Sequence, residues 1–318
     1  MENNKPYISL LMYTYNRPHL LGRSLDSVLN QTFQDFEIIL INNGSDEPTK
    51  KLLKNYEDNS KIRIFHFEKN RGYIGAFNFA IEQIRGEWFS ELSDDDFLEK
   101  DAFETLLKIP NIIDPSINAV SCNGHDTATG GWSGLGLDRD QYLPLSTIVE
   151  KCGGDFWGIT KTKLIGNNKL NTNLRGLENT FWYKIDAAAN RYYIHQQLMT
   201  YDTAHDKRET NVQEVFDFKE KAIFYTELLN EKFYWEAIKK YNHSEFIHKC
   251  FCGLLFLKME NDKVNMNKYV QMLNNTSINI MDRLMEKMII ETNPTLLKKM
   301  YKFSKNKLAL SFSKNHNI

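Results

Sequence analysis

Two stretches near the N-terminus indicate the fold of this chain. Residues 8–18 read ISLLMYTYNRP, and residues 36–46 read FEIILINNGSD. Each begins as a short apolar run and ends in residues that favour turns, and Leu21 and Leu25 recur at helical spacing after Pro18. This order predicts a strand, a helix and a second strand, the start of a parallel sheet with helices on its faces.

The alternation of strand and helix continues to about residue 100. Helices are predicted over 50–56 and 75–84, and strands over 62–67 and 88–92. A polar cluster follows each of the first four strands, at Thr14–Arg17, Asn42–Asp46, Asn70–Gly72 and Asp94–Asp96. Ligands of parallel α/β sheets bind beyond the carboxyl ends of the strands, so these clusters predict one binding site.

The rest of the chain changes character near residue 212. A fifth strand over 119–122 precedes a glycine-rich loop over 123–142, and a helix over 177–190 and a strand over 192–200 follow. Beyond residue 212 the sequence predicts helices alone, over 215–241, 245–260, 268–273, 278–290 and 296–303. We therefore expect an α/β domain over 1–212 and a helical domain over 213–318.

Composition excludes several classes of protein. The 318 residues carry 40 Lys and Arg against 41 Asp and Glu, and a net charge of −1 is unlike that of a globally basic nucleic-acid binder. Apolar runs are far shorter than the ~20 residues of a membrane span. The N-terminus lacks the basic start and apolar stretch of a signal peptide, and the four cysteines fit neither a disulfide framework nor a zinc spacing. We expect a cytoplasmic protein that binds no nucleic acid.

The acidic triplet Asp94–Asp96 is the strongest candidate for chemistry. Carboxylates suit a hard divalent metal, which bridges phosphates and neutralises the charge of a departing diphosphate. A solvated loop in which Asp96 caps a helix that begins near Lys100 is an equally good interpretation. Arg17 either contacts a nucleotide or lies on the surface, and Asn43 either reads a base edge or forms an Asn-Gly turn. The sequence contains no P-loop and no dinucleotide-binding motif.

Four segments together closely resemble the inverting, family 2 glycosyltransferases of GT-A fold. They are ISLLMYTYNRP, SLDSVLNQTFQDFEIILINNGSD, NRGYIGAFNFAI and GEWFSELSDDD, and they cover nearly all of residues 7–101 in the family's order and spacing. The resemblance thins after Ala119 and is absent beyond about residue 212. It implies a Rossmann-like GT-A domain with a nucleotide-binding half over about 1–100 and an acceptor half over about 101–212. The helical part is then a C-terminal subdomain.

The resemblance also implies roles by position. Asp95 is the expected ligand of Mn²⁺ or Mg²⁺, Asp96 is an alternative ligand, and Asp94 is expected to contact the ribose or the sugar. Asn43 stands where an acidic residue usually contacts the base. The residues expected to border the nucleotide and the donor sugar are Tyr13, Thr14, Tyr15, Arg17, Asn70, Gly72 and Asn78.

The expected catalytic base is Glu178. The family places a carboxylate at a helix start in the second half of the domain, and residues 176–182, GLENTFW, match that pattern. Such a base must lie near the acceptor hydroxyl, whereas a first-turn glutamate favoured by the helix dipole is the alternative. His205 resembles a histidine that many members place after the last strand, where it completes the metal site or contacts the diphosphate. An ordinary surface histidine is the alternative.

The resemblance implies a metal-dependent transfer with inversion from a nucleotide-sugar, with a UDP-sugar as the first expectation. The expected acceptor is a hydroxyl of a glycan or lipid-linked saccharide in bacterial capsule, lipopolysaccharide or other surface-polysaccharide synthesis. Asn42, Asn43, Ser93 and Asn179 depart from the family pattern. The first three give some weight to a non-catalytic binding or scaffold subunit, whereas the acidic triplet and Glu178 count against it. A sugar nucleotidyltransferase fits less well, because LLMYTYNRP lacks a Gly-rich loop that carries Arg or Lys.

The charge is unevenly distributed along the chain. Residues 1–212 carry 23 basic and 29 acidic side chains, and residues 213–318 carry 17 and 12. No acidic residue follows Glu291, whereas six lysines do, interleaved with apolar residues. Basic amphipathic segments bind anionic lipid head groups, so this tail predicts peripheral attachment to the inner face of the cell membrane. A solvated helix end and a contact within a homo-oligomer are the alternatives.

Overall fold

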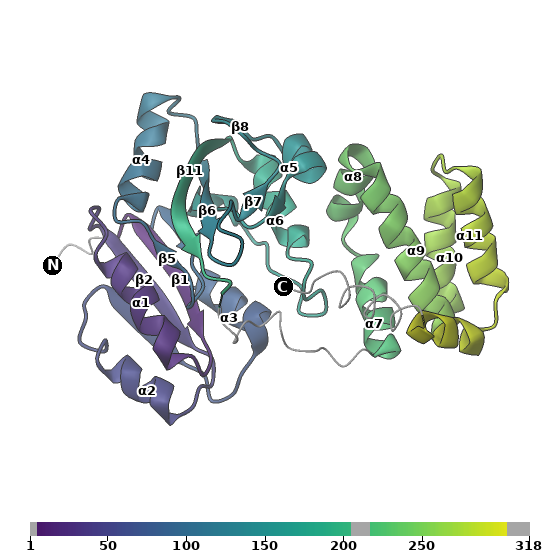
Figure 1. Ribbon diagram of the computed structural model, residues 1–318, viewed down its shortest axis with the longest axis horizontal. Helices are drawn as coiled ribbons and strands as arrows, with labels where there is room; N and C mark the ends of the chain where they lie inside the picture. The colour runs from purple at the N-terminus through teal and green to yellow at the C-terminus, as the bar shows by residue number, and fades with distance from the viewer. Residues whose placement is uncertain (1–4, 205–216, 304–318) are drawn as a thin grey trace. The chain divides into compact units, whose positions relative to one another are not determined.

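The computed structural model describes residues 5–204 and 217–303 (Figure 1). The chain divides into two compact units, residues 1–213 and 214–318. In the described residues no helix is both long enough and apolar enough to cross a membrane.

A nine-stranded mixed sheet is the centre of the first unit. Its strand order is β3-β2-β1-β4-β10-β6-β11-β5, with β8 paired to β11. Strands β3, β2, β1 and β4 are parallel neighbours and β6 is parallel to β11, whereas β10 runs antiparallel between β4 and β6. The strands are β1 (Ile8–Thr14), β2 (Phe36–Asn42), β3 (Ile62–His66), β4 (Trp88–Glu91), β5 (Phe97–Leu98), β6 (Ala119–Asp126), β8 (Gln141–Tyr142), β10 (Trp157–Lys161) and β11 (Arg191–Tyr201).

Two apolar cores lie on the two faces of this sheet. Side chains of a strand alternate between faces, and accordingly Leu10 of β1 belongs to one core and Leu11 to the other. Burial on both faces explains why the parallel strands read as continuous apolar runs. Helices α1 (Pro18–Leu29), α2 (Glu47–Lys54) and α4 (Ala102–Ile112) contribute to the first core, and α3 (Gly72–Ile81) and α6 (Asn179–Ala188) contribute to the second.

The first unit differs from the sequence expectation mainly between residues 119 and 161. The segment predicted as a loop over 123–142 begins with the end of β6, because residues as far as Asp126 pair with β11. The polar run from Asn123 to Asp126 has no apolar alternation that would have indicated a strand. The same region contains β8, the pair β7 (Gly134–Leu135) and β9 (Gly153–Gly154), and α5 (Leu145–Lys151).

Asp96 does not cap the helix that follows it. Helix α4 begins at Ala102 and its N-cap residue is Asp101. The Asp96 side chain instead accepts a hydrogen bond from the backbone N–H of Asp202, at 2.9 Å from Oδ1. The capping interpretation of the acidic triplet is therefore wrong, since the carboxylate is committed to a contact 106 residues away in sequence.

The second unit is helical in its described part. The single helix predicted over 215–241 is two helices, and Trp235 Nε1 donates to the Leu228 carbonyl at 2.7 Å across the break. Gly253 packs beneath Tyr269, whose ring lies 2.4 Å from the place a Cβ would take. The helices are α7 (Phe218–Leu228), α8 (Lys232–Tyr241), α9 (His243–Met259), α10 (Lys263–Asn274), α11 (Ile280–Glu291) and a last helix over 294–303.

Candidate active site

The predicted gathering of polar clusters at one edge of the sheet is confirmed. Asn16, with a left-handed φ of 57° that asparagine tolerates, accepts a hydrogen bond from the Asp46 N–H at 2.8 Å. Asn43 accepts one from the Arg71 N–H at 2.9 Å. The segments after β1, β2 and β3 are thus joined by direct hydrogen bonds, and Arg17 extends the network to the segment after β4.

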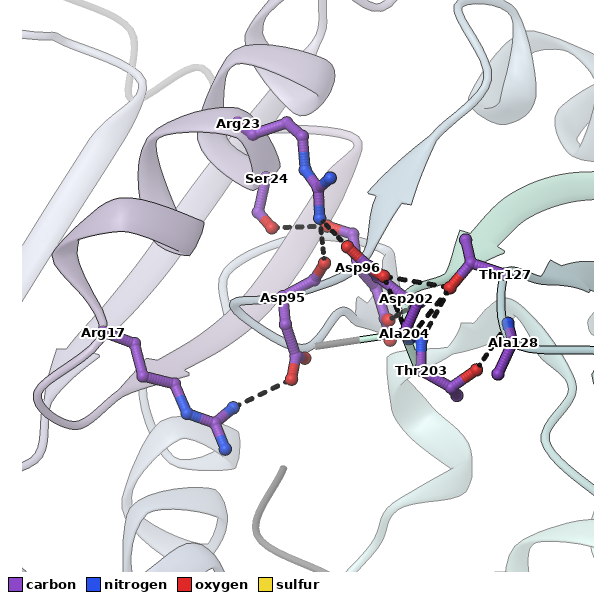
Figure 2. Close-up of polar contacts among 10 residues, drawn as sticks. All are labelled: Arg17, Arg23, Ser24, Asp95, Asp96, Thr127, Ala128, Asp202, Thr203 and Ala204. Carbon is purple, nitrogen blue, oxygen red and sulfur yellow. Dashed lines mark hydrogen bonds and ion pairs between the residues drawn. The ribbon is translucent and has the colours of Figure 1, made fainter. Parts of the chain in front are cut away.

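Arg17 joins the first cluster to the acidic triplet. Its Nη1 lies 3.1 Å from Asp94 Oδ1 and 2.9 Å from Asp95 Oδ2, and all three side chains are largely buried. Figure 2 shows Arg17 reaching from the start of α1 toward Asp95. Burial raises the pKa of Asp94 to about 6 although Arg17 acts against the shift. The carboxylates therefore form a cluster that depends on nearby positive charge.

Three polar atoms near this cluster are buried and have at most one another as hydrogen-bond partners among the described residues. They are Tyr13 Oη, Thr14 Oγ1 and Asp94 Oδ2. A buried polar atom without a partner costs about 1–3 kcal/mol, and such atoms in native structures call for an explanation. They lie at the end of β1 and shortly after β4, where the resemblance places a nucleotide-sugar.

The donor set fits a divalent cation that shares its ligands with a substrate. Asp95 and Asp96 offer the carboxylate oxygens that Mg²⁺ or Mn²⁺ prefers. The described residues bring together no group of three His, Cys, Asp or Glu side chains able to hold a metal. Such an ion would therefore take its remaining ligands from phosphate oxygens and water, the usual arrangement for Mg²⁺ at phosphate substrates.

A hydrogen-bonded network holds the end of β11 against the acidic triplet (Figure 2). Asp202, whose N–H binds Asp96, pairs through its carboxylate with Arg23 and accepts from Thr127 Oγ1 at 2.9 Å. Thr127 Oγ1 also accepts from the backbone N–H of Ala204 at 3.1 Å. Ala204 is the last described residue before the gap, and this network holds the chain up to that residue. His205 itself lies outside the described residues.

A cavity of about 540 Å³ lies beside the triplet and is lined by both Asp96 and Glu178. Glu178 directly precedes α6, and its Oε1 accepts from the Gly176 N–H at 3.0 Å. Asn78 fixes the segment that leads to this helix, because its side-chain amide pairs with the backbone N–H and carbonyl of Leu170 at 2.9 and 2.8 Å. The predicted base and Asp96 of the acidic triplet therefore line one cavity.

Of the remaining predicted residues, Asn43, Asn70 and Gly72 lie where the ends of β2 and β3 meet the start of α3, and Tyr15 lies at the surface. Asn43 also donates to the Gly72 carbonyl at 3.2 Å, so it ties the end of β2 to the start of α3 and keeps one donor and one acceptor position for a base. Asn70 Oδ1 accepts from the Gly72 N–H at 2.7 Å. Gly72 has a left-handed φ of 68°, and open space surrounds the place a Cβ would take. Tyr15 is 42% exposed at the surface.

Sequence reasoning missed Glu91 and Tyr73, which line the same cavity. Tyr73 Oη donates to Glu91 Oε2 at 3.2 Å, and burial together with the charge of Glu178 raises the pKa of Glu91 to about 7. A signal was present, because Glu91 is an acidic residue at the end of the mostly buried strand WFSE. Burial of an ionisable group in a strand often marks a functional site.

The sequence also matches a known family model, that of glycosyl transferase family 2, over residues 9–193. The chain belongs to glycosyltransferase family 2. A relative of Campylobacter jejuni, the GalNAc(5)-diNAcBac-PP-undecaprenol beta-1,3-glucosyltransferase, is 29% identical over 201 residues, 62% of this chain and 64% of that protein. The hyaluronan synthase of Pasteurella multocida is 36% identical over 107 residues, 33% of this chain and 11% of that protein.

Solved structures share the GT-A fold of this chain. TarS 1–349 of S. aureus in complex with UDP-GlcNAc has a TM-score of 0.59 at 18% identity, covering 89% of this chain and 79% of that chain. The mannosyltransferase PcManGT of Pyrobaculum calidifontis, in complex with GDP-Man and Mn²⁺, has a TM-score of 0.50 at 14% identity, covering 94% and 88%. Less than two thirds of each of these two curated relatives is covered by this chain.

Proposed function

We propose that this transferase moves a sugar, with inversion and with the help of a divalent metal, from a nucleotide-sugar to a hydroxyl of a glycan or lipid-linked saccharide. The observation that carries the proposal is a cavity lined by both Glu178 and Asp96, the last residue of the acidic triplet. A base on one side and a leaving-group site on the other is the arrangement that a single displacement needs.

The chain's own residues divide the work of the reaction. Glu178 takes the proton of the acceptor hydroxyl, whose oxygen attacks the anomeric carbon as the bond to the diphosphate oxygen breaks. Arg17 and the backbone after β1 orient the donor, and Asp94, which is buried beside Arg17, binds its ribose or sugar. Asp95 and Asp96 would hold Mn²⁺ or Mg²⁺, which supplies positive charge to the departing diphosphate.

The donor is proposed to be a UDP-sugar. Support comes from TarS, which was solved with UDP-GlcNAc and shares the fold. PcManGT was solved with GDP-Man and Mn²⁺, so the fold also accommodates a guanine nucleotide and a metal. Asn43 has both a donor and an acceptor position to offer a base, and it alone does not select uracil.

The proposed acceptor is linked to a lipid, and the second unit offers a surface for a membrane. Lipid-linked acceptors are supported by the name of the C. jejuni relative. Five exposed apolar side chains follow helical spacing on α11, and three more do so on the last helix, where Lys299 and Lys302 are also exposed. They are Ile280, Met281, Leu284, Met285, Met288, Leu296, Met300 and Phe303. The tail lysines beyond residue 303 lie outside the described residues.

We propose that this apolar face rests on anionic lipid at the inner face of the cell membrane, with residues 1–212 as the catalytic domain. Flotation with phosphatidylglycerol vesicles tests the membrane contact. The triple variant Met281→Gln, Leu284→Gln and Met288→Gln should lose recovery with the vesicles, whereas Val264→Gln, an equally exposed apolar site on α10, should keep it. Equal recovery would refute the membrane contact, and a changed oligomeric state in the triple variant would assign the face to a homo-oligomer.

Thermal stabilisation by nucleotides tests the proposed function. A ligand that binds the folded state raises stability by mass action, so UDP with Mn²⁺ should raise the melting temperature more than UDP with EDTA. Stabilisation by GDP instead of UDP would contradict the proposed UDP-sugar donor, whereas the proposed sugar transfer would stand. The absence of stabilisation by any nucleoside diphosphate, with or without metal, would favour the non-catalytic binding subunit.

A further inference from the structure

We propose that Glu91 selects the charge of the acceptor, so that the cavity takes an uncharged, hydroxyl-rich sugar ring and rejects a ring that carries a carboxylate or phosphate. The inference rests on the proposed function, because it names the substrate class of the same site. It concerns a residue that has no part in the reaction as described above.

Glu91 is held at the wall of the cavity by contacts with its neighbours. It is the last residue of β4, and Tyr73 Oη donates to its carboxylate at 3.2 Å. Trp157 Nε1 donates to its backbone carbonyl at 3.0 Å. The charge of Glu178 acts on both Glu91 and Tyr73, so the two glutamates lie within electrostatic reach of each other on the cavity wall.

The cavity is lined by more carboxyl groups than cations. Carboxyl groups line it at five positions, namely Glu91, Asp96, Asp155, Glu178 and Asp186. Among the described residues that line it, Arg191 is the one cation. Its guanidinium is already held, at 2.7 Å by Asp186 and at 2.8 Å by Ser121 Oγ, and this group is buried. Asp96 is a proposed metal ligand, but along the rest of the described wall an anionic acceptor would meet Glu91, Asp155 and Glu178 and no cation that is available to pair with it.

The environment of Glu91 disfavours a negative charge at this point of the cavity. Burial and the charge of Glu178 raise its pKa to about 7, because both disfavour its ionised form. A carboxylate on the substrate, bound beside Glu91, would meet the same desolvation and the same repulsion. A sugar hydroxyl meets neither, since it donates to an ionised carboxylate and accepts from a protonated one.

Aromatic rings on the cavity wall offer an apolar surface to a sugar, in addition to the hydrogen-bonding carboxyl groups. Tyr73, Trp157 and Trp182 line the cavity together with the carboxyl groups. Trp182 stacks on Phe89 with ring centroids 6.2 Å apart and an interplanar angle of 11°, so its plane is fixed by the core. An apolar ring beside hydrogen-bonding groups suits a sugar, which has an apolar C–H face and a polar rim.

Paired acceptors test the proposal. With a donor that the full chain hydrolyses, we would measure kcat/KM for the methyl glycosides of glucose, galactose and mannose, each against its uronic acid partner. The pair members differ in charge at one carbon. The neutral member should be favoured at least about tenfold, the scale expected for one like-charge contact in a partly buried site. Glu91→Gln should reduce this ratio at least about threefold, because it removes the charge and keeps the shape.

Glu87→Gln is the matched control. Glu87 precedes the other end of β4, is exposed and pairs with Lys161, so its substitution should leave the ratio unchanged. A wild-type ratio near one, or a preference for the uronic acid member, would overturn the inference without any variant. Donor hydrolysis without transfer to either member of any pair would also overturn it. The absence of hydrolysis for every donor would instead count against the proposed function.

Discussion

Replacing the buried Glu91 should change how the stability of this protein depends on pH. The pKa of Glu91 is raised from 4.5 to about 7 in the folded protein. Between these two values the folded state binds more protons than the unfolded state, so the free energy of unfolding falls as pH rises. One unit of pKa corresponds to about 1.4 kcal/mol, and the shift therefore represents about 3 kcal/mol lost between pH 4.5 and pH 7.

Glu91→Gln removes this titration and keeps the size of the side chain. The difference in the free energy of unfolding, variant minus wild type, should therefore increase by about 3 kcal/mol as pH rises from 4.5 to 8. Urea unfolding at a series of pH values measures the difference directly. Asp94 and Asp96 titrate in both proteins, so their contributions to the pH dependence of stability cancel in the comparison. Glu87→Gln changes an exposed position beside the same strand, so its curve of unfolding free energy against pH should run parallel to that of the wild type. Parallel curves for Glu91→Gln as well would show that Glu91 is not held in a charge-disfavouring cavity.

Three further predictions concern catalysis, the metal and the network around the acidic triplet. Glu178→Gln should lower kcat for transfer at least about 100-fold while the affinity for the nucleotide stays within twofold, and a variant with wild-type turnover would exclude Glu178 as the base. Asp95→Asn should abolish the extra thermal stabilisation that Mn²⁺ adds to UDP, and an undiminished Mn²⁺ effect would remove Asp95 from the metal site. Thr127→Val removes the hydroxyl that binds Asp202 and the Ala204 N–H, so urea unfolding should show a loss of about 1–3 kcal/mol. A loss below about 0.5 kcal/mol, the usual range for surface substitutions, would mean that this network adds little.

The parallel half of the sheet could be predicted from the sequence because each of its strands has a recognisable sequence pattern. Strands such as Phe36–Asn42 are buried on both faces and read as apolar runs, and each ends in a turn-forming polar cluster. The antiparallel strand β10 gave no such signal, since Trp157–Lys161 is short and contains Gly158 beside a neighbouring strand. Its place between β4 and β6 depends on pairings with residues far away in sequence.

The contacts of the candidate site also fall into those that the sequence could predict and those that it could not. Contacts between strand ends follow from topology, and so Arg17 and the acidic triplet were predictable as neighbours. The partner of Asp96 was not, because Asp202 is 106 residues away and no pattern in the sequence links the two. Glu91 was overlooked for a different reason: the apolar run around it indicated a core strand, and its opening onto a cavity depends on Tyr73 and Trp157 from other elements.

The configuration of the released sugar tests the central claim most directly. Wild-type protein with Mg²⁺ would be given UDP-glucose, UDP-GlcNAc, UDP-galactose and GDP-mannose in turn, and early hydrolysis products would be followed by proton NMR before the sugar mutarotates. Single displacement on an α-linked donor predicts that the β-anomer appears first. First appearance of the α-anomer would contradict the inverting mechanism and the role of Glu178, and no release from any donor would contradict the assignment of the cavity as a transferase site.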